Sequence, residues 1–220
     1  MSGPPKSTSP HPLKLVVGLG NPGPAYGLTR HNVGFRIAER LAQSCSIESD
    51  EQRFGGRFRR GFVAGADTHP FEIGILQPET FMNRSGTAVR AAVRELGIRD
   101  CRCDLLVVFD DVDLPFGQLR VRPSGGAGGH RGLADILAEL GTLGIENVPR
   151  LRFGVGRSEA GGDTADYVLE AFSESEESQL PQRLKLAAEA LRVALGEGIP
   201  VAMNRFNRPP KADPEGDVEA

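Results

Sequence analysis

Three side chains that could support hydrolysis follow apolar stretches of this sequence. Asn21 comes shortly after the stretch Leu13–Leu19, His31 lies a little further on, and Asp110 follows the stretch Leu105–Phe109. An imidazole can take a proton from water, while amide and carboxylate groups can hold the reacting atoms in place. If both stretches are parallel strands, their carboxyl ends share one edge of a sheet, where these side chains can meet. The pattern therefore favours a site built around one histidine.

Two further polar clusters occupy the same kind of position. Thr80–Asn83 follows the apolar stretch Phe71–Gln77, and the glycine-rich segment Ser124–Gly129 leads into His130. Each cluster alone has a simpler explanation, because Asn and Ser cap helices, Asp forms turns and glycines make loops flexible. Ser85 is expected to cap the following helix rather than to act as a nucleophile. The joint occurrence of such clusters after separate strands is what favours a functional site.

The turn Gly18–Gly23 also matches the G-x-G-x-x-G pattern of dinucleotide-binding loops. Such a loop needs a helix that begins within the motif, so that the helix N-terminus faces the pyrophosphate. Pro22, Gly23 and Pro24 resist a continuous helix there, and the polar segment Ser46–Gln52 is not expected to form the next strand of that fold. A nicotinamide or flavin oxidoreductase is therefore the weaker alternative.

The spacing of the apolar residues predicts one α/β domain, in which helices flank a mixed, twisted β-sheet. The expected strands are Leu13–Leu19, Arg57–Ala64, Phe71–Gln77, Leu105–Phe109, Gln118–Val121 and Leu151–Val155. The expected helices are Val33–Ser44, Ser85–Leu96, Leu133–Leu140 and Ser173–Leu195. We assign residues 13–207 to this domain and expect disorder in the N-terminal extension 1–12 and the acidic tail 208–220.

Composition is typical of a cytoplasmic protein. No apolar run approaches the roughly 20 residues that span a bilayer, and the Ser/Pro-rich N-terminus lacks the apolar core of a signal peptide. The three cysteines are expected to be free thiols. A zinc site is not expected, because no second pair of ligands accompanies them. The net charge is −3, yet arginine outnumbers the acidic residues between positions 53 and 157. That distribution is compatible with an RNA-binding face or with an ordinary mixed-charge surface.

Six short motifs follow one another along nearly the whole chain, from about Leu13 to Phe206. They are Gly18–Gly23, Thr29–Asn32, Thr80–Gly86, Asp110–Pro115, Gly128–His130 and Arg152–Arg157. The set and its order resemble the bacterial-type peptidyl-tRNA hydrolases. The resemblance implies an enzyme that cleaves the ester between a peptide and the terminal ribose of tRNA, and so recycles tRNA from stalled translation.

The resemblance also implies roles for individual side chains. His31 would be the general base that activates water, Asp110 would orient His31, and Asn21 would contact the substrate and help to reject unblocked aminoacyl-tRNA. The residues implied to bind tRNA and peptide are Tyr26, Phe81, Met82 and Asn83. The partner would be peptidyl-tRNA, with no membrane partner. We expect a cytoplasmic monomer. Neither a cofactor nor a metal ion is expected, because an ester already has a good leaving group.

One position departs from the family pattern. The family has Gly-Gly-His-Asn-Gly where this chain has Gly128-Gly129-His130-Arg131-Gly132. The family asparagine contributes to substrate binding. Arg131 could replace it as a phosphate contact, although a guanidinium group cannot accept hydrogen bonds. An RNA-binding module that keeps the fold and has lost hydrolysis remains the alternative, and the presence of Asn21, His31 and Asp110 argues against it.

Overall fold

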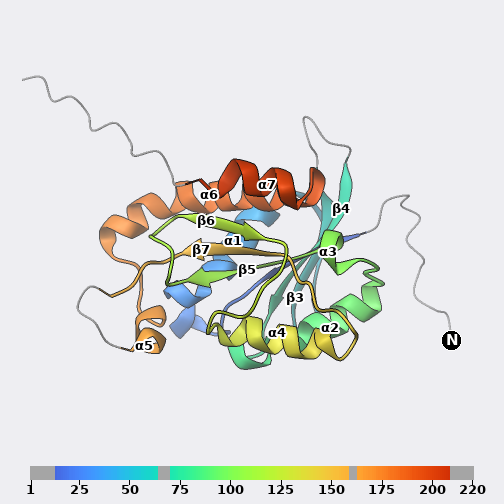
Figure 1. Cartoon of the computed structure of the whole chain (residues 1–220), viewed down its shortest axis with the longest axis horizontal. Coiled ribbons are helices and arrows are strands. Elements are labelled where there is room, and N and C mark those ends of the chain that lie inside the picture. Colours follow the sequence, from blue (N-terminus) through green and yellow to red (C-terminus); the bar gives the residue numbers. More distant parts are fainter. Residues whose placement is uncertain (1–12, 64–69, 159–162, 209–220) are drawn as a thin grey trace, which may run out of the picture.

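A computed structural model describes residues 13–63, 70–158 and 163–208, and within them one sheet with helices on both faces forms the molecule (Figure 1). The strands are β1 (Lys14–Gly18), β2 (Ser46–Arg53), β3 (Gly56–Val63), β4 (Phe71–Pro78), β5 (Leu105–Asp111), β6 (Leu119–Arg122) and β7 (Arg150–Gly154). Their order is β2-β3-β4-β1-β5-β7-β6. Strands β4, β1, β5 and β7 are parallel, whereas β2–β3, β3–β4 and β6–β7 pair antiparallel. The predicted α/β domain with a mixed sheet is confirmed.

Two layers of helices cover the sheet. The helices of the described residues are α1 (Val33–Ala42), α2 (Ser85–Leu96), α3 (Cys101–Asp104), α4 (Arg131–Gly141), α5 (Thr164–Val168), α6 (Glu174–Gly196) and α7 (Ile199–Phe206). Three single 3-10 turns lie between strands and helices: η1 (Pro24–Tyr26) and η2 (Arg30–Asn32) precede α1, and η3 (Met82–Arg84) precedes α2. Helices α1, α6 and α7 pack on one face, and α2 and α4 on the other (Figure 1).

The central strand β1 contributes to both cores, which explains its unbroken apolar sequence. Side chains of successive strand residues point to opposite faces. Leu15 and Val17 therefore join the core under α2 and α4, while Val16 joins the core under α1 and α6. All three are fully buried. A strand covered on both faces needs apolar residues along its interior, and the one charged residue of β1 is Lys14 at its first position.

The expectation that Ser46–Gln52 would not form a strand is wrong. These residues lie in β2, which pairs antiparallel with β3 at one edge of the sheet. An edge strand with little of its surface buried can be polar and charged, and such charges discourage pairing with other chains. The edge position also agrees with the rejection of a dinucleotide fold, because the neighbours of β1 are β4 and β5.

The opposite edge of the sheet is covered by a helix that the sequence analysis did not predict. Helix α7 contacts β6, and Asn207 follows the end of α7. The Asn207 Oδ1 accepts a hydrogen bond from the Val121 N–H at 2.6 Å, and its Nδ2 donates to the Val121 carbonyl at 3.1 Å. One side-chain amide thus takes the place that a neighbouring strand would occupy.

The N-terminal extension and nearly all of the C-terminal tail, for which disorder was predicted, lie outside the described residues. The domain limits at 13 and 207 therefore stay a prediction. Among the helices of the described segments, none is both long and apolar enough to cross a membrane.

Two glycines allow the start of α1 to pack directly on the end of β1. A Cβ on Gly18 would lie 2.4 Å from the Gly34 carbonyl oxygen, and a Cβ on Gly34 would lie 2.5 Å from the Leu19 and Val108 oxygens. Neither distance is possible for a real side chain, so this contact requires glycine on both sides. The close contact fixes the turn η2, which carries His31 immediately before α1.

Candidate active site

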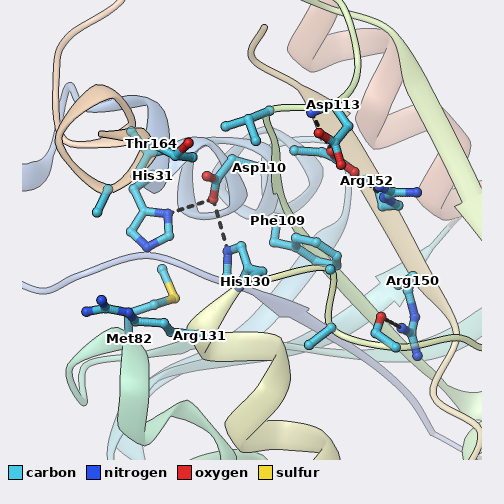
Figure 2. A pocket seen from close by; sticks show the side chains of 18 of the residues that line it. His31, Met82, Phe109, Asp110, Asp113, His130, Arg131, Arg150, Arg152 and Thr164 are labelled. Carbon is cyan, nitrogen blue, oxygen red and sulfur yellow. Dashed lines mark hydrogen bonds and ion pairs between the residues drawn. The ribbon is translucent and has the colours of Figure 1, made fainter. Parts of the chain in front are cut away.

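The carboxyl ends of the parallel strands border a pocket of about 1040 Å³ (Figure 2). Asn21 follows β1, Met82 follows β4 and Asp110 lies near the end of β5. His31 enters from the turn η2, and His130 from the loop before α4. The structure therefore brings together the amide, imidazole and carboxylate groups that the sequence places after separate strands.

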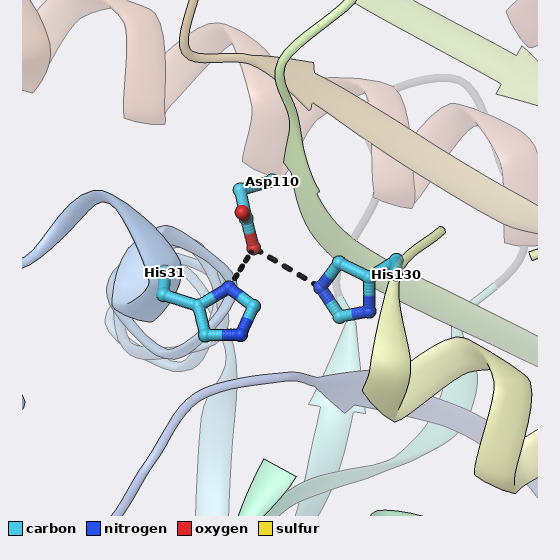
Figure 3. A group of neighbouring side chains, drawn as sticks. All are labelled: His31, Asp110 and His130. Atoms are coloured by element: carbon cyan, nitrogen blue, oxygen red, sulfur yellow. Dashed lines mark hydrogen bonds and ion pairs between the residues drawn. The ribbon is translucent and has the colours of Figure 1, made fainter. Parts of the chain in front are cut away.

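Asp110 lies between two histidines (Figure 3). Its Oδ1 is 2.8 Å from His31 Nδ1 and 3.1 Å from His130 Nε2. The Asp110 side chain is 3% exposed, against 13% for His31 and 7% for His130. The carboxylate is thus withheld from solvent, while the ring of His31 borders the pocket.

The surroundings of Asp110 keep its carboxyl group ionised. Burial by itself raises the pKa of Asp110, but the hydrogen bonds of His130 and His31, together with the charge that either ring carries when it is protonated, outweigh burial and bring the pKa well below its ordinary value. An ionised carboxylate only accepts hydrogen bonds. His31 must therefore place its proton on Nδ1, which leaves Nε2 with a free lone pair. The His31 Nε2 makes no hydrogen bond with the described residues.

His31, Asp110 and His130 are also the three described residues whose donor atoms lie close enough together to hold a metal ion. However, His31 Nδ1 and His130 Nε2 are both at hydrogen-bond distance from the same oxygen of Asp110. A metal ion would need its ligand atoms about 2.0–2.2 Å away and directed at itself rather than at each other. Hydrogen bonding accounts for the grouping, and these residues do not fit a metal site in this arrangement.

Asn21 has a structural task as well as a place in the pocket. Its Oδ1 accepts a hydrogen bond from the Met82 N–H at 2.9 Å. Its backbone is bonded to the side chain of Asn32, since Asn21 N–H donates to Asn32 Oδ1 and Asn32 Nδ2 donates to the Asn21 carbonyl. One lone pair of Oδ1 and the backbone N–H are therefore already engaged, and the Nδ2 amide is the group of Asn21 that can donate to a ligand.

The residues after β4 divide between the pocket and the core. Phe81 is 59% exposed and lines the pocket together with Asn83 and the buried Met82. Ser85 is fully buried, and its hydroxyl donates to the Met82 carbonyl at 2.9 Å. The expectation that Ser85 caps the helix is wrong: it is the first residue of α2, and Arg84 precedes it as the N-cap residue.

The two remaining predicted binding residues differ in position. Arg131 is exposed and lines the pocket beside Met82 (Figure 2). Tyr26 is half-buried in the turn η1 and is not among the residues that line the pocket. The structure therefore does not bring Tyr26 together with the other predicted site residues.

Several arginines on the pocket wall were not predicted from the sequence. Arg150 is 2% exposed, and its guanidinium donates to the carbonyls of Gly125, Gly126 and Val148. It thereby holds the glycine-rich loop in place. Arg152 forms an ion pair with Asp111, and Arg122 and Arg157 also line the pocket, as does the predicted Arg131. The sequence Arg-Leu-Arg within a buried strand could have indicated these arginines, because a charged side chain in a buried strand needs a partner.

The turn that carries His31 is tied to the C-terminal part of the chain by the neighbouring residue, Arg30. Its Nη1 donates to the Ala171 carbonyl at 2.6 Å and its Nη2 to Glu176 at 2.9 Å. The guanidinium carbon lies 4.3 Å from the centre of the Tyr167 ring and 5.4 Å from that of Phe172. Both terminal nitrogens of Arg30 are therefore bonded to structural partners, and Arg30 is not among the residues that line the pocket.

A buried carboxylate that is hydrogen-bonded to a histidine beside a pocket lined by several arginines is an arrangement typical of hydrolases. Comparisons with known proteins narrow this class. The family model described as peptidyl-tRNA hydrolase matches residues 15–214. The chain therefore belongs to the peptidyl-tRNA hydrolase family.

Individual relatives agree with this assignment. A peptidyl-tRNA hydrolase of Synechococcus sp. (strain JA-2-3B'a(2-13)) is 44% identical over 98% of this chain and 92% of the relative. One of Chloroflexus aggregans is 44% identical over 88% of this chain and 98% of the relative. The crystal structure of peptidyl-tRNA hydrolase from Acinetobacter baumannii superimposes with a TM-score of 0.77 at 32% identity, covering 90% of this chain and 97% of that one.

Proposed function

We propose that the protein hydrolyses the ester between peptide and tRNA in peptidyl-tRNA, with His31 as the general base and Asp110 as the group that orients it. Family membership supports the overall reaction. The observation that carries the mechanism is the 2.8 Å contact of His31 Nδ1 with the buried Asp110 Oδ1, beside a pocket that His31 borders. A base held in this way keeps its second ring nitrogen free for water.

The reaction then proceeds in two steps at one carbonyl carbon. His31 Nε2 takes a proton from water as the water oxygen attacks the ester carbonyl, which gives a tetrahedral intermediate with a negatively charged oxygen. The imidazolium formed on His31 is stabilised by the ionised Asp110. The ester C–O bond breaks, and His31 returns the proton to the departing ribose oxygen. A free peptide and a free tRNA hydroxyl are the products.

We further propose how the pocket binds substrate. The Asn21 Nδ2 amide, its one available donor, faces the carbonyl or its developing negative charge. Phe81, Met82 and Asn83 contact the end of the tRNA and the peptide, and Arg131 contacts a phosphate. Tyr26, which lies outside the pocket lining, belongs to the outer part of the tRNA- and peptide-binding surface.

The decisive experiment is the cleavage of N-acetyl-aminoacyl-tRNA by the wild-type protein and by His31→Ala under single-turnover conditions. We expect the wild type to release the acylated amino acid. The variant should be inactive while it keeps its circular dichroism spectrum and its affinity for tRNA. Near-normal cleavage by His31→Ala would exclude this residue as the base. Binding of tRNA without cleavage by the wild type would instead support the RNA-binding module that has lost hydrolysis.

The cytoplasmic location and the monomeric state stay predictions. Fractionation of cells and the molecular mass of the protein in solution would test them.

A further inference from the structure

We propose that His130 is a positioning residue that stays neutral, donates its Nε2–H to Asp110 and so aims the carboxylate at His31. This inference rests on the proposed function, because it assigns a task to a residue that acts through Asp110. The sequence motif contains His130, but neither its spacing nor its type indicates which of its nitrogens carries the proton. The structure supplies that information.

The first step is the position of His130 at the start of a helix. It is the N-cap residue of α4, where its carbonyl accepts a hydrogen bond from the Ala134 N–H at 2.9 Å. Its side-chain Nδ1 lies 3.1 Å from the backbone nitrogen of Leu133. A backbone N–H only donates, so the His130 Nδ1 must accept. That nitrogen therefore carries a lone pair and no proton.

The second step follows from the composition of the ring. A neutral imidazole has one N–H, and when Nδ1 accepts, the proton lies on Nε2. The His130 Nε2 is 3.1 Å from Asp110 Oδ1, so this contact is a hydrogen bond donated by His130 to the carboxylate. Because Nδ1 caps the helix, His130 is the donor in its hydrogen bond with Asp110, the contact drawn in Figure 3.

The third step concerns charge. Protonation of His130 would place a proton on Nδ1, opposite the Leu133 N–H and at the positive end of the α4 dipole. The ring also packs against Phe109, with centroids 4.6 Å apart, and is 5.1 Å from the ring of His31. Of the two imidazoles bonded to Asp110, only His31 can become a cation without losing a hydrogen bond. The negative charge of Asp110 therefore attracts one imidazolium, that of the base His31, and not a second one.

Two substitutions separate the two hydrogen bonds of His130. In His130→Asn, the shorter side chain keeps an oxygen close to the place of Nδ1 and remains a good N-cap, but it loses the donor to Asp110. In His130→Gln, the amide nitrogen can reach the place of Nε2 and donate to Asp110, but Gln is a poor N-cap. His130→Asn therefore keeps the helix cap and loses the contact with Asp110, whereas His130→Gln keeps the contact and loses the cap.

Cleavage of N-acetyl-aminoacyl-tRNA and thermal unfolding should respond in opposite ways. We expect His130→Asn to keep its Tm and to lose about tenfold or more in kcat with KM unchanged, as for the loss of a hydrogen bond to a charged group. His130→Gln should restore kcat to within about threefold of wild type while its Tm falls. If kcat follows Tm in both variants, or if neither variant changes kcat, the positioning role is refuted.

A spectroscopic measurement tests the proposal on the wild-type protein, independently of any variant. The ¹⁵N chemical shifts of His130 should show a protonated Nε2 and an unprotonated Nδ1 at neutral pH. A protonated Nδ1, in either the other tautomer or the imidazolium, would overturn the proposal. An active wild type with unaffected His130 variants would refute only this inference, whereas full activity of His31→Ala would refute the proposed function itself.

Discussion

Replacing Asp110 by Asn removes the charge of the site while keeping its shape. The Oδ1 of Asn can still accept both imidazole N–H groups, because His31 and His130 point at the same oxygen. What disappears is the attraction between the carboxylate and the imidazolium that the proposed mechanism forms on His31. We therefore expect kcat to fall while KM for peptidyl-tRNA stays nearly constant.

The geometry sets the size of this effect. With Nδ1 and Oδ1 2.8 Å apart, the centres of the two charges are about 4 Å apart, where unit charges attract by about 4 kcal/mol at an effective dielectric constant near 20. The exposed edge of His31 and the neutral dipole of Asn reduce the loss to about 2–4 kcal/mol. At about 1.4 kcal/mol per tenfold change, kcat should fall by about 30- to 1,000-fold.

The assay is single-turnover cleavage of N-acetyl-aminoacyl-tRNA over a range of enzyme concentrations. Asp113→Asn is the matched control, since Asp113 lies in the turn directly after β5 and lines the same pocket but pairs with the exposed Arg157. It corrects for any general gain in RNA affinity from removing one negative charge. A kcat for Asp110→Asn within about threefold of the control would refute the role of the carboxylate.

Three further outcomes are expected. Because the folded-state pKa of Asp110 lies below its ordinary value of 3.8, the carboxylate stabilises the fold above that pH and loses this effect on further acidification; the Tm of Asp110→Asn should depend less on pH below 5 than that of wild type, and parallel curves would contradict this. Burial raises the pKa of Cys101 to about 11, so a thiol reagent at pH 8 should label exposed Cys103 first; labelling of Cys101 at an equal rate would contradict its burial. Arg131→Asn should weaken tRNA binding most at low salt, and a salt-independent effect would exclude a phosphate contact.

The sequence predicts those parts of the site that lie directly at strand ends. Asn21 follows β1 and Asp110 lies near the end of β5, and the apolar runs of these two strands indicate that they are buried parallel strands. A parallel sheet places such ends on one edge whatever the surrounding loops do. For the same reason, the position of Met82 after β4 could be predicted.

Contacts that depend on the direction of a side chain could not be predicted. The polar strand β2 has the composition of a loop because it lies at an edge of the sheet. Ser85 has the type of a helix cap, yet its hydroxyl is turned toward the Met82 carbonyl. Tyr26 lies close to His31 in the sequence but is not among the residues that line the pocket. In each case the three-dimensional packing, rather than local preference, decides the outcome.

The anchoring of Arg30 has a consequence for how the enzyme acquires its activity during folding. Its hydrogen bonds to Ala171 and Glu176 join residues 141 and 146 positions apart in the chain. Contacts between such distant residues require the closure of a long loop and tend to form late. Secondary structure should therefore recover before ester cleavage does when the denatured protein is refolded. Under the proposed mechanism, the recovery of activity therefore reports the formation of these long-range contacts around His31.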